Sequence, residues 1–329
     1  MKRIKLLLIA LNVMLISICT AQKIELLSTG VKSSLRGLSV VNDNIIWASG
    51  SNGTVLKSTN AGITWQQIII PNFEKRDFRD IEAFDSNTAI IMSIAEPAHI
   101  LKTTDGGKNW NIVFADSTKG MFLDAMYFKD AKNGIVVGDP INNKAFIATT
   151  SNAGKTWIIN NNTPELANGE AFFASSGSNI FLQKANIFFV SGGKQSNLYF
   201  NNKKLEIPIN KGLESTGANS ISVFKNTAII VGGDFTKDSS TTGNCILLNL
   251  KTKQFTTPTT LPTGYRSCVI QLNKKQAVTC GINGVDLSND SGMNWSNISK
   301  EGFHVVAKAE KGKAVYFAGS KGRIGKLIY

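Results

Sequence analysis

The sequence has few of the residues that build metal sites and disulfide frameworks. Its 329 residues include two histidines, four cysteines and seven prolines. His99 and His304 show no ligand spacing with cysteines or carboxylates, so we expect no metal site, and we expect no cofactor. Only Cys245, Cys268 and Cys280 follow the N-terminal region, and an odd number cannot all pair within one chain. A bridge between Cys268 and Cys280 is conceivable, although a role as small buried side chains is favoured.

Long apolar segments and helical periodicity are also missing after the N-terminus. No such segment approaches the ~20 apolar residues that a membrane helix needs, so we expect no stable membrane insertion. A basic helix and aromatic residues interleaved with Arg and Lys are absent as well, which argues against a nucleic-acid partner. Apolar residues nowhere recur at the spacing of a helix, which leaves strands as the main elements. The pattern indicates an all-β protein, and we expect a monomer.

The first 21 residues have the organisation of a signal peptide. Lys2, Arg3 and Lys5 precede an apolar stretch from Leu6 to Ile18, and Cys19-Thr20-Ala21 supplies small residues for cleavage. Lipidation at Cys19 is the lesser alternative, because Ile18 stands where a small residue is required. We therefore expect a periplasmic or secreted protein with one domain over residues 22–329.

The charge balance is basic. The chain has 36 Lys and Arg residues against 23 Asp and Glu residues, a formal net charge of +13. Removing the three basic residues of the signal peptide leaves 33 against 23, or +10. Such an excess favours acidic glycans, membrane surfaces or acidic protein patches as partners, although it also serves solubility.

Four segments repeat one pattern in which a hydroxyl residue is followed by Asp or Asn, Gly and Trp. They are Ser58–Trp65, Thr103–Trp110, Thr150–Trp157 and Ser288–Trp295. Their tryptophans are separated by 45, 47 and 138 positions, and the last interval equals three steps of 46. A period in the mid-forties is the length of a four-stranded propeller blade. The repeat therefore predicts a seven-bladed β-propeller in which two blades between the third and fourth boxes have lost the motif.

Short β-branched and aromatic runs give the strands of each predicted blade. In the first blade they are Leu38–Val41, Ile45–Ser49, Thr54–Ser58 and Trp65–Ile70. The second strands of the two blades without a box are Ile187–Ser191 and Ala228–Gly232. The last blade begins at Phe303 and has only three strands. We expect Ile24–Ser28 to supply the fourth and close the ring, because closure removes an exposed sheet edge.

The four repeated segments resemble Asp boxes, Ser/Thr-x-Asp-x-Gly-x-Thr-Trp. In such a turn the Asp or Asn side chain bonds local backbone, Gly takes a conformation closed to other residues, and Trp fills the space between blades. We expect these residues to be structural. The mature chain resembles the family of the photosystem II assembly factor Ycf48, a seven-bladed propeller with Asp boxes, and more distantly the sialidase superfamily.

Four phrases look like those of an uncharacterised exported branch whose members are sometimes labelled oxidoreductases. They are Leu35–Leu38, Phe78–Ile81, Gly138–Ile141 and Gly169–Ser175. The oxidoreductase label has no support in the sequence, since the glycine-rich run Gly319–Gly325 precedes no helix.

Sialidase chemistry is not indicated either. The resemblance implies an Arg-Ile-Pro phrase and a Tyr nucleophile assisted by Glu, whereas Arg36 is followed by Gly37 and Leu38, and Tyr265 has no identifiable Glu partner.

Alignment of the blades predicts one ring of side chains around the mouth of one face. The aligned residues are Arg36, Arg79, Leu123, Ala171, Asn219, Arg266 and His304. Asp80 and Asp124 follow this position, Glu170 precedes it, and the loops between second and third strands add Glu96, Asp139, Lys194 and Asp234. Three arginines would then gather on one side of the mouth with His304 between them. The alternative is that they are solvated rim charges paired with neighbouring acids.

The first functional hypothesis is an exported binding or assembly module that recognises an acidic ligand, protein or glycan, at this arginine-bearing face. The candidate ligand-binding residues are Arg36, Arg79, Asp80, Asp124, Asp139, Glu170, Arg266 and His304. The alternative is a hydrolase or lyase that uses carboxylates of the same face on a carboxylated or sulfated saccharide.

Overall fold

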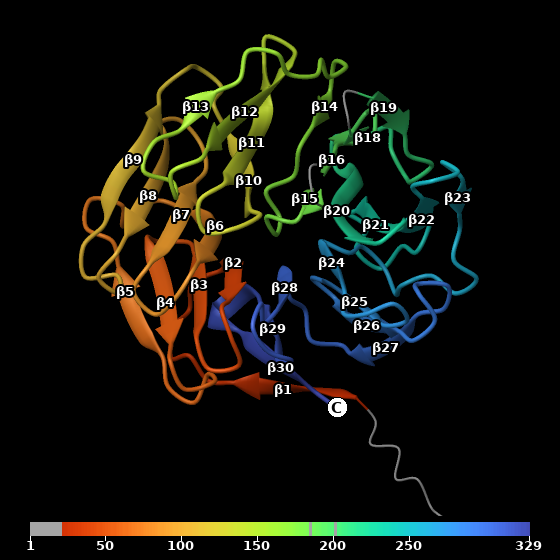
Figure 1. The fold of residues 1–329 in the computed structure, drawn as a ribbon. Helices are drawn as coiled ribbons and strands as arrows, with labels where there is room; N and C mark the ends of the chain where they lie inside the picture. The colour runs from red at the N-terminus through yellow and green to blue at the C-terminus, as the bar shows by residue number, and fades with distance from the viewer. Residues whose placement is uncertain (1–21, 184–185, 201–202) are drawn as a thin grey trace, which may run out of the picture.

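The computed structural model describes residues 22–183, 186–200 and 203–329 as a ring of seven antiparallel sheets (Figure 1). The predicted seven-bladed β-propeller is confirmed. Within the described residues the only helical element is a short 3-10 turn, η1 (Ser320–Gly322). The predicted signal peptide, including Cys19, lies outside the described residues.

Blades 1 to 3 follow one another along the chain, each with its first strand nearest the ring centre. Blade 1 comprises β2 (Leu35–Val40), β3 (Ile46–Gly50), β4 (Thr54–Ser58) and β5 (Gln66–Ile69). Blade 2 comprises β6 (Phe78–Ala83), β7 (Ala89–Ser93), β8 (Ala98–Thr103) and β9 (Asn111–Asp116). Blade 3 comprises β10 (Leu123–Phe128), β11 (Gly134–Ile141), β12 (Lys144–Thr150) and β13 (Ile158–Ile159).

Blades 4 to 6 complete most of the ring. Blade 4 comprises β15 (Ile180–Gln183), β16 (Asn186–Val190), β18 (Asn197–Phe200) and β19 (Lys203–Glu206). Blade 5 comprises β20 (Thr216–Phe224), β21 (Thr227–Asp234), β22 (Cys245–Asn249) and β23 (Phe255–Thr256). Blade 6 comprises β24 (Cys268–Gln271), β25 (Ala277–Gly281), β26 (Gly284–Ser288) and β27 (Ser296–Ser299).

The two ends of the chain meet in blade 7. Its sheet contains β28 (Val305–Lys308), β29 (Val315–Ala318), β30 (Ile324–Ile328) and, at the outer edge, β1 (Lys23–Leu27). β1 pairs antiparallel with β30, with Lys23 opposite Ile328. The strand lies one residue before the expected Ile24–Ser28, and it covers the edge that β30 would otherwise expose.

The Asp boxes form the turns between third and fourth strands. In blade 2 the Thr103 hydroxyl oxygen accepts the N–H of Gly107 at 3.0 Å, and the Asp105 carboxylate accepts the N–H of Asn109 at 2.9 Å. Gly106 and Gly107 both have left-handed backbone, with φ of 79° and 87°. These bonds are internal to the turn, so the box residues have a structural role.

Each box also packs against the preceding blade. A Cβ atom on Gly107 would lie 2.6 Å from Ile68 Cδ1 of blade 1, and one on Gly154 would lie 2.4 Å from Ile90 Cδ1 of blade 2. Blades 4 and 5 have no box and cannot make this contact.

The first strand of blade 4 is interrupted. β14 (Glu170–Ala171) pairs with β17 (Gly192–Gly193), while β15 pairs with β16. Between β14 and β15 the chain runs toward the ring centre (Figure 1). We call residues 172–179 the channel plug. The blade alignment assumed that Ala171 begins a continuous inner strand, and the structure shows that it does not.

The plug is held by hydrogen bonds to blades 5 and 6. The Ser176 hydroxyl donates a hydrogen bond to the Ser267 carbonyl oxygen of blade 6 at 2.7 Å. The Ser178 hydroxyl bonds that of Ser220 in blade 5 at 2.7 Å. The segment consequently crosses the space that a propeller usually leaves as a central channel.

All three described cysteines are buried free thiols. Cys268 and Cys280 are directly opposite each other on β24 and β25, and they pack in the apolar core with Val278 and Val285.

Candidate functional site

The first strands of four blades begin with a β-bulge at the mouth of the ring. In blade 1, Leu35 is opposite Gly50 and Gly37 is opposite Ser49, so Arg36 is the extra residue. The same shift makes Arg79, Asp124 and Asn219 the extra residues of β6, β10 and β20. Bulges near functional sites re-aim side chains, and here all four line the central cavity.

Blades 6 and 7 reach the same arrangement through their backbone bonds. The Ser267 N–H donates to the Cys280 carbonyl oxygen, although Cys280 is already the partner of Cys268. The His304 N–H donates likewise to Ala318, the partner of Val305. Ser267 and His304 therefore hold the positions in these blades that Arg36 holds in blade 1.

This register corrects the predicted ring in two blades. Asp124 and not Leu123 faces the mouth in blade 3, and Ser267 and not Arg266 faces it in blade 6. Neighbouring residues of a strand point to opposite sides, so a shift of one residue turns each side chain away.

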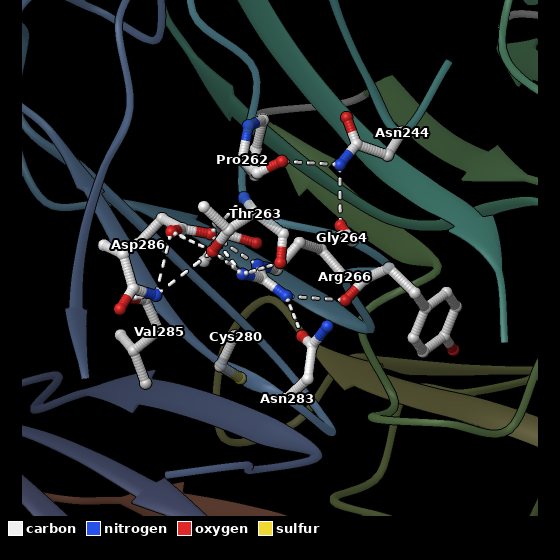
Figure 2. A network of polar contacts seen from close by, with 12 residues as sticks. Asn244, Pro262, Thr263, Gly264, Arg266, Cys280, Asn283, Val285 and Asp286 are labelled. Carbon is white, nitrogen blue, oxygen red and sulfur yellow. Dashed lines mark hydrogen bonds and ion pairs between the residues drawn. The ribbon is translucent and has the colours of Figure 1, made fainter. Parts of the chain in front are cut away.

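Arg266 is a structural residue (Figure 2). Its side chain is 0% exposed and forms an ion pair with the equally buried Asp286 at 2.5 Å. Its other donors reach the Asn283 side chain at 2.6 Å and the carbonyl oxygens of Tyr265 and Thr263 at 2.8 Å. All of its polar atoms are thus engaged inside the protein. The prediction that three arginines share the mouth is wrong for Arg266.

Glu170 and Asp80 also serve the fold and do not line the central cavity. The Glu170 carboxylate is buried and accepts hydrogen bonds from Asn197 and Tyr199, both at 2.7 Å. Asp80 is buried beside the plug and accepts the N–H groups of Ile81 and Met126 at 2.9 and 2.7 Å. Glu170 is thus bonded to β18 of blade 4, and Asp80 joins the inner strands β6 and β10, so neither carboxylate faces a ligand at the mouth.

The central cavity has a volume of about 520 Å³. Five of the eight predicted site residues line it: Arg36, Arg79, Asp124, Asp139 and His304. Sequence reasoning missed its apolar wall, which is formed by Phe122, Phe172, Phe173, Phe235, Tyr265 and Ile282. Phe172 and Phe173 belong to the phrase Gly169–Ser175, which was the one signal in the sequence for this wall. The wall makes the cavity suitable for an apolar group that accompanies an anion.

The two arginines are only partly neutralised. The Arg36 Nη1 donates to the Ser175 carbonyl oxygen at 3.4 Å, and the Arg79 Nη2 lies 3.5 Å from Asp77 Oδ2. Burial, together with the neighbouring Arg79 charge, lowers the pKa of Arg36. A bound anion would relieve this repulsion, because it would face both guanidinium groups at once.

His304 contributes hydrogen bonding without charge. Its Nε2 lies 2.9 Å from the Ser320 hydroxyl and 3.2 Å from that of Ser34. Burial, followed by the charges of Arg36 and Arg79, lowers the pKa of His304 to about 3. The ring is therefore neutral near pH 7.

Two of the three acids that line the cavity, Asp124 and Asp139, hold protons more tightly than free carboxyl groups. The Asp139 carboxylate accepts the N–H of Phe172 at 2.9 Å, and burial raises its pKa to about 6. Burial, followed by the nearby Asp139, raises the pKa of Asp124 well above its usual range. The cavity thus combines two arginines with the carboxyl groups of Asp124, Asp139 and the exposed Glu214.

A model of the family described as "Photosynthesis system II assembly factor YCF48" matches residues 17–119, which include β1 and blades 1 and 2. The chain resembles the YCF48 family. The resemblance inferred from the Asp boxes is thereby confirmed. No protein of curated function matches the chain.

Solved structures extend the likeness of this YCF48-like chain to the whole ring. A structure described as "YCF48 bound to D1 peptide" superposes with a TM-score of 0.66 at 14% identity, covering 94% of this chain and 96% of that one. YCF48 from Cyanidioschyzon merolae gives 0.63 at 18% identity, covering 94% and 99%. The WD40 domain of Neurospora crassa Pan2 gives 0.61 at 12% identity, covering 90% and 89%. At these identities the likeness shows the fold alone.

Two negative findings apply to the described residues of this YCF48-like chain. They include no group of three His, Cys, Asp or Glu side chains placed to hold a metal ion. None of their helices is long and apolar enough to cross a membrane. The glycine-rich run Gly319–Gly325 forms η1 and the start of β30, and no helix follows it.

Proposed function

We propose that this YCF48-like propeller is a binding or assembly module that takes an acidic group of a protein partner into its central cavity. The observation that carries the proposal is the pair Arg36 and Arg79. Both side chains are placed by bulges at the mouth and both line the same cavity. Arginine suits planar recognition of carboxylates because its fork can form two parallel hydrogen bonds.

The walls favour a protein segment over a glycan. Phe122, Phe173 and Phe235 line the cavity beside the two arginines, whereas a saccharide would need polar partners for many hydroxyl groups. An acidic residue next to an aromatic or aliphatic one would satisfy both parts of the site. YCF48 itself has been solved with a D1 peptide, which supports a peptide ligand for this chain as well.

The plug forms part of the cavity wall. Ala174 and Ser175 of the plug line it, and the bonds of Ser176 and Ser178 anchor the segment beneath. A bound group would therefore enter from the mouth and stop there. This geometry suits a side chain or chain end.

Hydrolysis of a saccharide has weaker support. The Asp139 carboxylate already accepts a hydrogen bond from the N–H of Phe172, and Asp124 is fully buried.

We further propose that the protein acts outside the cytoplasm, because its first 21 residues have the organisation of a signal peptide.

The test uses a panel of fluorescent peptides in which Asp or Glu stands next to Phe, with Asn and Gln counterparts as neutral probes. We expect the acidic peptides to bind and the double substitution Arg36→Gln with Arg79→Gln to weaken binding at least tenfold, since a hydrogen bond to a charged group contributes about 1.5–3 kcal/mol. Arg323→Gln is the matched control, because Arg323 pairs with Glu301 and does not line the cavity. Equal binding by the double variant would refute the proposal.

A further inference from the structure

A second and larger cavity lies between blades 3 and 4. Its volume is about 920 Å³. The blade 3 wall contains Ile135, Ile147 and Ile159, and the blade 4 wall contains Ile187, Phe189, Tyr199 and Phe200. We call it the interblade groove. It shares no lining residue with the central cavity.

The groove lies where an Asp box is missing. At two of the interfaces that have a box, between blades 2 and 3 and between blades 5 and 6, the second strand of one blade contacts the box glycine of the next. Ile90 contacts Gly154, and Ile229 lies 3.0 Å from the position of a Cβ on Gly292. Ile135 has the corresponding place on β11 of blade 3. Blade 4 offers neither the box turn nor its tryptophan, so Ile135 lines an open space instead.

The deep walls of the groove offer almost no hydrogen-bonding groups. β11 and β12 are each paired on both sides, as are β16 and β18, so their backbone groups are already used. The Tyr199 hydroxyl donates to Glu170 at 2.7 Å. A peptide backbone placed there would lose its bonds to water without replacement, whereas a hydrocarbon chain would lose nothing. The walls therefore favour an aliphatic ligand over a polypeptide.

Positive charge lies at one side of the opening. Lys203 and Lys204 of β19 line the groove together with the amides of Asn160–Asn162. Lys204 is 43% exposed and lies 3.2 Å from Glu170, whereas no acid among the described residues forms an ion pair with Lys203. Glu165 also lines the groove, but it is not within ion-pair distance of either lysine. An anionic head is therefore favoured at the β19 side.

We propose that the interblade groove binds an aliphatic carboxylate, with its hydrocarbon chain between blades 3 and 4 and its carboxylate near Lys203. The volume falls within the range of about 300–1,000 Å³ that small-molecule sites occupy. The proposal is independent of the function proposed for the central cavity, because the two sites have separate walls.

The test is calorimetric titration of the mature protein with octanoate, decanoate and dodecanoate below their micellar concentrations. We expect saturable binding at one site, with affinity rising about fourfold for each added methylene. Dodecanol should bind more weakly than dodecanoate, and Lys203→Gln should remove that difference. Equal affinity of the alcohol and the carboxylate for the unmodified protein would overturn the assignment of an anionic head.

Two neighbouring residues of β13 provide a matched pair of variants. Ile159 lines the groove and is 46% exposed, whereas Ile158 is 67% exposed and points to the other side of the strand. Ile159→Glu should weaken dodecanoate binding at least tenfold, and Ile158→Glu should leave it unchanged. Equal effects would show nonspecific surface binding and overturn the proposal. Saturable binding of the acidic peptides but not of dodecanoate, abolished by Ile159→Glu, would assign the groove to a polypeptide instead.

Discussion

A Cβ atom on Gly177 would lie 2.4 Å from the Oδ2 of Asp80. The plug thus rests directly on a buried carboxylate of blade 2, at a residue whose φ of +66° suits only glycine well. The contact is part of what holds residues 172–179 across the ring.

We expect Gly177→Ala to destabilise the protein by about 2–4 kcal/mol, from the clash and the backbone strain together. Urea unfolding would measure the change. Gly120→Ala is the control, since Gly120 also has a positive φ of 84° but open space around its Cβ position, and it should cost only about 1 kcal/mol. Equal losses would show that the plug tolerates a shift away from Asp80.

Replacement by Gln should lower the free energy of unfolding strongly at Arg266 and hardly at all at Arg79. Arg266→Gln leaves Asp286 buried without its ion-pair partner, and breaking such a pair costs about 3–5 kcal/mol. Arg79→Gln removes a partly exposed pair at 3.5 Å, so its effect on the free energy of unfolding should stay within about 0.5 kcal/mol. The urea midpoints of the two variants would decide this, and a stable Arg266→Gln would contradict the structural role given to that network.

Trp295 is the most buried of the four box tryptophans, with 4% of its surface exposed. It packs between blades 5 and 6 against Ile229 and Leu247. Trp295→Ala should therefore destabilise the protein by about 3–5 kcal/mol through the cavity it leaves. Trp110→Ala should cost less, because Trp110 is only partly buried. Ile63→Ala, at a box position that is 79% exposed, should leave the midpoint unchanged.

The strand order was predictable because the Asp boxes mark one turn per blade and the apolar runs lie at regular distances from it. The register at the ring mouth was not. A bulge adds one residue to a strand without altering its apolar pattern, so Leu123 and Asp124 could not be told apart from spacing. The same uncertainty placed Arg266 at the mouth, where the structure has Ser267.

The channel plug could not be predicted from the sequence for a different reason. Its conformation depends on bonds to blades that are distant in the sequence, such as those from Ser176 to Ser267 and from Arg36 to Ser175. Local propensity at Gly169–Ser175 is compatible with a strand, and nothing nearby signals that the chain leaves the sheet. The interblade groove was likewise not predicted, although the sequence does show that blade 4 lacks an Asp box, and the groove lies at that place.

Asp139 should make the protein less stable as the pH rises. Its pKa is raised by burial from 3.8 to about 6, so the folded state favours the protonated form. The stabilisation is complete below pH 4 and is lost as the pH increases through 6.

Asp139→Asn removes this loss while retaining an oxygen for the N–H of Phe172, and we expect it to raise the melting temperature at pH 7.5 but not at pH 4. Asp43→Asn is the contrasting variant. The N–H groups of Ala314 and Lys313 lower the pKa of Asp43, so the stability it contributes is present above pH 4 and is lost as the pH falls. Asp43→Asn should therefore lower the melting temperature at pH 7.5, and thermal unfolding followed by circular dichroism from pH 4 to 7.5 would compare the two. A melting temperature of Asp139→Asn that stays below that of the unmodified protein at pH 7.5 would show that the Asp139 carboxylate is stabilised as an anion.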